Sequence, residues 1–272
     1  MPEPTSPDPI WNPFDMKADL EGALDQDQFF LVYQPEIDLH TNAFTGVESL
    51  IRWRHPQRGV LSPDDFVPEL ETSGQIVQVG QWAMATACAQ GAEWHDKGYR
   101  FTVSVNISVK QIEHANFVRQ IDVALRSSRF PPALLVLEFS QFTLAGLGAP
   151  SKLLSQLKAL GVRLAVDDFE PGRSLLDDLR TSSIDIVKLD RRFIAKLSGS
   201  TASTKLVHTL VDAAKQSNLQ IVASGIEDDE QRRQLKLEDV DIGQGFHFSK
   251  PHEAQEITRY LQDFAIFSGK PL

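Results

Sequence analysis

The chain has 272 residues, more than most single-core domains but within the range of an α/β barrel. Its formal net charge of -10 argues against a DNA-binding protein, because proteins that follow a nucleic-acid backbone present a basic face. An acidic protein can still bind a phosphodiester if divalent cations lie between the two sets of negative charge.

The first residues of the chain are rich in proline, with Pro2, Pro4, Pro7, Pro9 and Pro13 among polar side chains. Such a composition disfavours a helix, so residues 1–18 are expected to be a linker and residues 19–272 a single domain. The linker suggests an adjoining domain, such as a sensor or a cyclase. No apolar run reaches membrane-spanning length, and no secretory signal precedes the domain, so membrane insertion is not expected and a cytoplasmic location is.

Short strand-forming runs alternate with longer amphipathic stretches along the rest of the chain. The predicted strands are Phe29–Gln34, Val47–Trp53, Phe101–Ile107, Leu134–Phe139, Val162–Asp167, Ile184–Leu189, Leu219–Ala223 and a weak Val240–Gly243. The predicted helices are Ile76–Lys97, Ile112–Ser127, Ser151–Leu160, Thr204–Gln216 and Glu230–Leu237. This alternation, with nearly all-apolar strands, indicates a parallel sheet buried on both faces.

Eight strands in a chain of this length favour closure into a (β/α)8 barrel of the TIM type. An open, doubly wound sheet is the alternative. No Gly-x-Gly-x-x-Gly sequence follows the first strand, which weakens a dinucleotide-binding interpretation of that alternative.

Several predicted strands end on, or run into, side chains that bind metals or phosphate. In chain order these are Glu48, Asn106, Glu138, Asp167 and Asp168, Lys188 and Asp190, and Ser224 with Glu227. The carboxyl ends of parallel strands converge on one mouth of a barrel, so these groups are expected to form a ring. Oxygen ligands without clustered His or Cys suit magnesium, manganese or calcium better than zinc.

Each of these residues alone also has a structural interpretation. Asn106 could cap the helix that follows, and Lys188 could extend from its strand end and pair with Asp190. Several carboxylates crowded into one mouth would repel one another unless a cation or a buried lysine neutralises them. The set as a whole therefore favours a metal site.

Residues 48–53, Glu-Ser-Leu-Ile-Arg-Trp, resemble the Glu-Ala-Leu-Leu-Arg-Trp signature of the EAL family of cyclic di-GMP phosphodiesterases. The flanks agree, with Tyr-Gln-Pro at 33–35 and His-Pro at 55–56. Further matches are Val-Asn-Ile-Ser at 105–108, Val-Asp-Asp-Phe at 166–169, Val-Lys-Leu-Asp at 187–190 and Gln-Gly-Phe at 244–246. The resemblance covers about residues 19–251 and implies a modified barrel in which one strand runs against the others.

The resemblance also implies a two-metal site filled by Mg²⁺ or Mn²⁺. Glu48, Asn106, Glu138 and Asp167 would bind the first ion. Asp167 would bridge to a second ion that Asp168 also approaches, and Lys188 would hold or deprotonate the attacking water with support from Glu227. The cyclic di-GMP contacts are expected at Gln34, Leu50, Arg52, Asp167, Gln244 and Phe246.

Three departures from the family pattern fall on functional positions. Ser224 stands where the family has a glutamate that binds the second metal, and a neutral, shorter hydroxyl supplies neither its charge nor its reach. Gln141 replaces the acid that anchors a mobile loop, and within that loop Glu170 and Pro171 replace Gly-Thr. The second metal is therefore doubtful, whereas the first is expected.

The resulting hypothesis is a receptor domain that binds cyclic di-GMP and hydrolyses it weakly or not at all. The alternatives are an active phosphodiesterase that forms linear pGpG, a protein-interaction module that has lost the nucleotide, and an unrelated barrel enzyme with a magnesium-stabilised enolate. The family resemblance implies a homodimer formed near the loop after Asp168, where Gln141 and residues 170–173 depart from the family pattern. A protein effector is a further possible partner.

Overall fold

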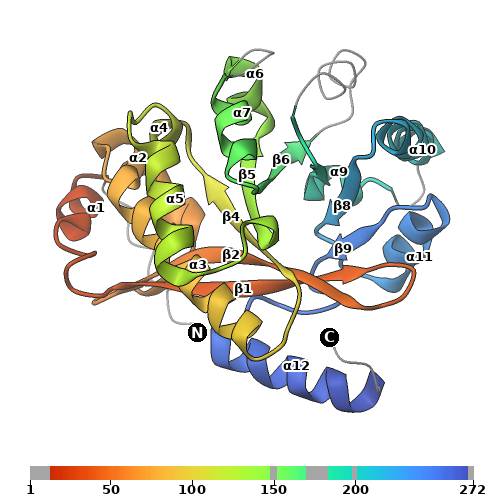
Figure 1. Cartoon of the computed structure of the whole chain (residues 1–272), viewed down its shortest axis with the longest axis horizontal. Helices are drawn as coiled ribbons and strands as arrows, with labels where there is room; N and C mark the ends of the chain where they lie inside the picture. Colours follow the sequence, from red (N-terminus) through yellow and green to blue (C-terminus); the bar gives the residue numbers. More distant parts are fainter. Residues whose placement is uncertain (1–12, 148–151, 170–182, 198–200, 269–272) are drawn as a thin grey trace, which may run out of the picture.

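In the computed structural model, hydrogen bonding between neighbouring strands closes a sheet into an eight-stranded barrel (Figure 1). The structure describes residues 13–147, 152–169, 183–197 and 201–268. Around the barrel the strands are β1 (Phe29–Asp38), β9 (Ile242–Gln244), β8 (Gln220–Ser224), β7 (Ile186–Leu189), β6 (Arg163–Phe169), β5 (Leu135–Ser140), β4 (Thr102–Ile107) and β2 (Phe44–His55). A short β3 (Gly59–Leu61) pairs with the end of β2 outside the ring.

One strand of the barrel runs against all the others. Strand β1 pairs antiparallel with β2 and with β9, whereas every other pair of neighbours in the ring is parallel. The predicted barrel with one antiparallel strand is confirmed, and closure of the ring excludes the open-sheet alternative.

Helices cover the outside of the barrel. The five predicted helices correspond to α3 (Ile76–Asp96), α5 (Phe117–Ser128), α7 (Lys152–Ala159), α10 (Thr201–Gln216) and α11 (Asp229–Leu237). The helix predicted from Ile112 instead begins at Phe117, because a separate turn, α4 (Val109–Ile112), is closed by a capping box between Ser108 and Gln111.

The sequence patterns missed several other helices. They are α1 (Pro13–Leu20), α2 (Pro63–Ser73), α6 (Gln141–Leu147), α9 (Arg191–Ile194), α12 (Ala254–Ser268) and the 3-10 turn η1 (Pro132–Leu134). In α2 the two prolines concealed the helix, although Pro63 stands at the first helical position, where its missing N–H costs nothing. No helix within the described ranges is both long and apolar enough to cross a membrane.

The described structure extends into the expected linker of residues 1–18. Helix α1 lies within the supposed linker, and Met16 is completely buried in a hydrophobic cluster with Trp53 and Phe66. His55 Nε2 lies 3.0 Å from Asp19 Oδ2, which ties the end of this helix to β2. The packed core therefore includes Met16.

Alternation along the strands fills the barrel in layers. One apolar layer is formed by a buried residue from each of five neighbouring strands: Val136, Ala165, Ile186, Val222 and Ile242. Residues two positions further along a strand lie on the same face. The next layer towards the carboxyl ends is therefore polar and consists of Glu138, Asp167, Lys188, Ser224 and Gln244.

Candidate functional site

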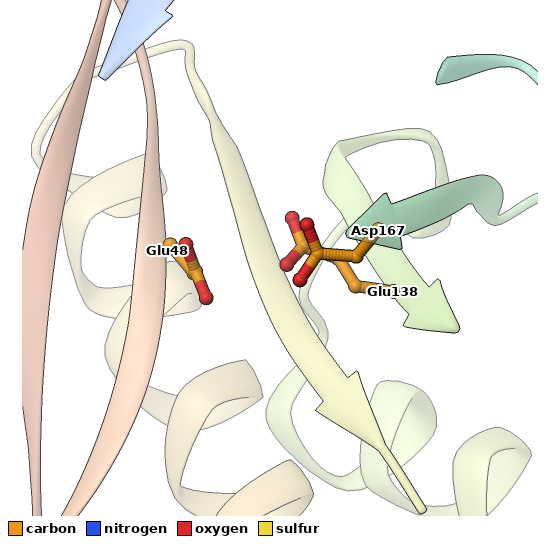
Figure 2. Close-up of side chains that lie close together, drawn as sticks. All are labelled: Glu48, Glu138 and Asp167. Carbon is orange, nitrogen blue, oxygen red and sulfur yellow. The ribbon is translucent and has the colours of Figure 1, made fainter. Parts of the chain in front are cut away.

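Three carboxylates from separate strands meet in this polar layer. Glu48 comes from β2, Glu138 from β5 and Asp167 from β6, and one oxygen of each lies within 4.8 Å of the others (Figure 2). Glu138 is almost fully buried and Glu48 is 9% exposed. The structure thus brings together three of the four residues expected to bind the first metal.

The fourth expected ligand, Asn106 at the end of β4, contacts the same group. Its Nδ2 donates to Glu48 Oε1 at 2.7 Å. Because the amide nitrogen is used in this way, the Oδ1 oxygen is the atom through which Asn106 would bind a cation. The alternative role of Asn106 as a helix cap is not observed, since Ser108 caps α4.

A buried lysine lies between the carboxylates. Lys188 on β7 is 1% exposed, and its Nζ donates to Glu48 Oε2 at 2.9 Å and to Glu138 Oε1 at 2.7 Å. It does not pair with Asp190, which rejects the structural interpretation of this lysine. The negative charges around it raise the pKa of Lys188 well above its ordinary value despite burial, so the side chain is an ammonium ion.

The carboxylates respond differently to this environment. Burial raises the pKa of Glu138 well above its ordinary value, and the charges of Glu48 and Asp167 add to this effect while Lys188 opposes it. Burial also raises the pKa of Asp167, to about 6. For Glu48 the Lys188 charge and the hydrogen bonds to the carboxylate outweigh burial, so its pKa is lowered. One ammonium ion does not neutralise the whole group.

The donor set fits a hard divalent cation. Glu138 Oε2 is buried without a hydrogen-bond partner, and so is Gln244 Oε1 in the same layer. An unpaired buried carboxylate oxygen is costly, and a cation bound to it would remove that cost. Oxygen ligands alone, without His or Cys, suit Mg²⁺ or Mn²⁺.

Glutamine side chains link the carboxylates to the next segment of the mouth. Gln244 Nε2 on β9 donates to Glu48 Oε2 at 2.8 Å and to Gln34 Oε1 at 3.2 Å. Gln34 Nε2 in turn donates to the backbone oxygen of Ser249 at 3.2 Å. Of the residues predicted to contact the nucleotide, Gln244 therefore also holds Glu48 in position, and Gln34 contacts Gln244.

Comparison with known proteins agrees with this geometry. The sequence model of the EAL domain family matches residues 17–251. This chain belongs to the EAL domain family.

Relatives of this EAL domain include two curated bacterial proteins. The chain is 35% identical over 241 residues to the bifunctional diguanylate cyclase/cyclic di-GMP phosphodiesterase MucR of Pseudomonas aeruginosa, covering 88% of this chain and 35% of MucR. It is 31% identical over 250 residues to the cyclic di-GMP phosphodiesterase PdeR of Escherichia coli, covering 92% of this chain and 38% of PdeR. The chain therefore spans little more than a third of the length of these relatives.

A solved structure described as the PaMucR phosphodiesterase in complex with c-di-GMP has the same fold. It superimposes with a TM-score of 0.84 at 34% sequence identity, and the match covers 89% of this chain and 99% of that one.

Asp168 of this EAL domain is not part of the group of three carboxylates. The register between β6 and β7 shifts between Val166 and Phe169, and Asp168 has a φ of 54°, in the left-handed region. A hydrogen bond joins its carboxyl group to that of Asp190. Burial and the Asp190 charge raise the pKa of Asp168 above its ordinary value.

Two of the positions that depart from the family pattern, Ser224 and Gln141, lie within the described residues. Ser224 ends β8, and its Oγ is buried without a hydrogen-bond partner. Glu227 lies exposed before α11, and its backbone N–H donates to Gln231 Oε1 at 2.8 Å. Gln141 begins α6 and is half-buried. Glu170 lies outside the described residues.

The remaining residues expected to contact the nucleotide lie further out at the mouth. Leu50 and Arg52 follow Glu48 at two-residue intervals on β2, and both are half-buried. Phe246 is 61% exposed, with the Lys250 Nζ 5.6 Å from the centre of its ring. An exposed aromatic ring at this edge offers a face on which a base can stack.

Sequence reasoning missed two features of the site. Glu36 on β1 is 4% exposed and lies 3.8 Å from Lys188, beside a cavity of about 60 Å³. Its spacing of two from Gln34 is the signal that could have placed it inside the barrel. The second is Arg192, whose guanidinium binds Asp190; the Asp-x-Arg spacing at the start of a helix is its only sequence signal.

Proposed function

We propose that this EAL domain binds cyclic di-GMP at the barrel mouth together with one Mg²⁺ or Mn²⁺ ion, and hydrolyses the nucleotide weakly or not at all. The observation that carries the proposal is an asymmetry. The first-metal group of Glu48, Glu138 and Asp167 is complete and has an unpartnered buried oxygen, whereas Ser224 brings no charge to the second group.

The acidic ring needs a cation before it can accept an anionic dinucleotide. A divalent ion bound to Glu48, Asn106, Glu138 and Asp167 would offset the negative charge that Lys188 leaves and would bind a phosphodiester oxygen. Lys188, already an ammonium ion between Glu48 and Glu138, would add a hydrogen-bond donor on the same side. The cyclic di-GMP complex of the structural relative supports this choice of ligand.

Other side chains at the barrel mouth can contact the remaining parts of the nucleotide. Arg52 can contact a phosphate or a guanine edge through its guanidinium, and Phe246 can stack on a base. Gln34 and Gln244 keep Glu48 in place beneath them. Leu50 supplies an apolar contact between these polar groups.

Weak hydrolysis is expected because the residues at the second metal position, Ser224 and Asp168, are poorly suited to bind an ion. When two divalent ions are bound, the second helps to generate the nucleophile and to stabilise the charge that develops on the reacting oxygens. Here Ser224 offers only a neutral hydroxyl, and Asp168 is committed to Asp190. Loss of one such contribution raises the barrel enzyme's activation barrier by several kcal/mol, and about 1.4 kcal/mol corresponds to a tenfold loss of rate.

The second candidate is an active phosphodiesterase that forms linear pGpG. It is favoured by the presence of Asp167, Asp168 and Lys188, and by the names of the relatives. Both candidates place the nucleotide at the same mouth and differ only in turnover.

One experiment separates the candidates. The purified domain is titrated with cyclic di-GMP by calorimetry in Mn²⁺ and in EDTA, and the Mn²⁺ sample is then assayed for pGpG by ion-exchange chromatography. We expect Mn²⁺-dependent binding with little or no product, and product formation to rise in Ser224→Glu. Turnover similar to that of a complete EAL enzyme would establish the phosphodiesterase instead. Absence of binding in Mn²⁺ would leave a protein-interaction module.

A further inference from the structure

The arginine Arg192 is bound to a second group of carboxyl groups, which consists of Asp168 and Asp190. Asp190 directly follows β7 and caps α9, and its carboxylate accepts a hydrogen bond from the Arg192 backbone N–H at 2.6 Å. The Arg192 guanidinium returns to the same carboxylate. Its Nε lies 2.9 Å from Asp190 Oδ1 and its Nη2 lies 2.8 Å from Oδ2. Asp190 is buried, at 3% exposed, while the arginine side chain is 66% exposed at the mouth.

This ion pair is connected to the expected second-metal residues. Asp168 is hydrogen-bonded to Asp190, so Arg192, Asp190 and Asp168 form one chain of contacts. Strand pairing places Leu189 opposite Ala223, which brings Ser224 beside Asp190 at the ends of β7 and β8. The backbone at Gly225 packs so closely on Arg191 that an added Cβ would lie 2.4 Å from the Arg191 Cβ, which fixes α9 against β8.

We infer that Arg192 is a built-in cation that takes the place of a second divalent ion at this end of the site. The inference rests on the proposed function, because it explains why the domain would work with a single metal. Two carboxyl groups, Asp168 and Asp190, face one guanidinium, and the neighbouring Ser224 adds no charge. A two-pronged guanidinium–carboxylate pair is among the strongest hydrogen-bonded ion pairs in proteins.

A second metal ion would have to break this arrangement. Asp168 would need to leave Asp190 in order to bind the ion, and the ion would come to lie near the positive Arg192. Without a glutamate at 224, nothing compensates for either change. Arg192 therefore lowers the affinity for a second ion while it keeps the buried Asp190 neutralised.

The test is Mn²⁺ binding without nucleotide, measured by calorimetry and by the electron paramagnetic resonance signal of free Mn²⁺. We expect one tight Mn²⁺ ion per wild-type chain. Arg192→Gln should bind a second ion at least tenfold more tightly than the wild type does. Arg192→Lys keeps the charge but loses the planar guanidinium group, so its affinity for a second ion should lie between those of Arg192→Gln and the wild type. Lys196→Gln, which removes an exposed cation just after α9, is the matched control and should behave as the wild type.

Two results would overturn the inference: a wild type that binds two Mn²⁺ ions with similar affinity, or an Arg192→Gln variant whose stoichiometry and affinities equal those of the wild type. Thermal unfolding of each variant establishes that it is folded before titration. Cyclic di-GMP binding is measured separately on the same samples. If the nucleotide fails to bind while the Mn²⁺ results hold, the proposed function fails and the role of Arg192 stands.

Discussion

Lys188 Nζ lies 2.7 Å from Glu138 Oε1 inside the barrel, and both residues are 1% exposed. The lysine shares its charge with Glu48 at 2.9 Å and reaches towards Glu36 at 3.8 Å. Within the described residues no other ammonium group contacts these carboxylates. In the metal-free protein this one side chain therefore stabilises a group of like charges.

Replacement of Lys188 by Met should destabilise the metal-free domain strongly. Loss of one partner of a buried ion pair leaves uncompensated charge and costs roughly 3–5 kcal/mol. Urea unfolding in EDTA measures the change in the free energy of unfolding. Lys97→Met, which breaks an exposed pair with Glu93, is the control and should cost no more than about 1 kcal/mol. Mn²⁺ should restore part of the loss in Lys188→Met, and equal stability of the variant and wild type would contradict the account.

Glu138→Gln should weaken the first metal site. The substitution keeps the size of the side chain but removes the charge of a ligand whose Oε2 is unpartnered. Loss of an outer-shell partner of a metal ligand costs about 10–100-fold in affinity, and loss of a charged ligand should cost at least as much. Calorimetric Mn²⁺ titration measures the effect, with the exposed Glu93→Gln as control. An unchanged Mn²⁺ affinity would remove Glu138 from the metal site.

The barrel could be predicted because its signals are local. Apolar strands such as those ending at Glu138 and Asp167 alternate with amphipathic helices, and the carboxyl ends of parallel strands must meet. The reversed direction of β1 had no such signal and came only from the family resemblance. The alternation that placed Glu138 and Asp167 in one layer also places Glu36 inside the barrel, but Glu36 lies in mid-strand rather than at a strand end.

Arg192 and α1 could not be predicted for different reasons. Arg192 reaches Asp190 because α9 begins there, and a helix of four residues leaves no periodic pattern in the sequence. The prolines before Pro13 dominated the composition around α1, so the sequence pattern offered no reason to expect that Met16 is buried. The burial of Met16 depends on contacts with distant segments such as Trp53 and Phe66, which composition does not report.

Glycine-to-alanine substitutions should distinguish packing against side chains, which can shift, from packing against the backbone, which cannot shift easily. At Gly46 an added Cβ would lie 2.4 Å from Thr102 Oγ1 and 2.5 Å from Glu36 Oε2, both side-chain atoms. At Gly245, beside Gln244, it would lie 2.1 Å from the Ile226 backbone oxygen, and φ is 157°. Overpacking costs about 1–3 kcal/mol where side chains can shift, and more where backbone must move.

The expected order of destabilisation is therefore Gly245→Ala, then Gly46→Ala, with little change for Gly146→Ala, where nothing lies within 4 Å of the added atom. Thermal and urea unfolding of the three variants gives the order. A Gly245→Ala variant as stable as Gly146→Ala would show that the turn after β9 is not packed against Ile226.

Met16→Ala tests whether the folded unit begins before residue 19. Met16 is completely buried in the cluster that contains Trp53, Phe66 and Leu70, so its truncation should leave a cavity and cost about 2–5 kcal/mol. Lys17→Ala, at the exposed neighbouring position on the same helix, is the matched control and should change the free energy of unfolding by less than about 0.5 kcal/mol. Equal stability of the two variants in urea would mean that α1 does not pack on β2 in solution, and the domain would then begin after it. A loss confined to Met16→Ala, with Mn²⁺ affinity unchanged, would assign α1 to the fold and not to the site, since its cluster lies outside the layer that holds Glu48, Glu138 and Asp167.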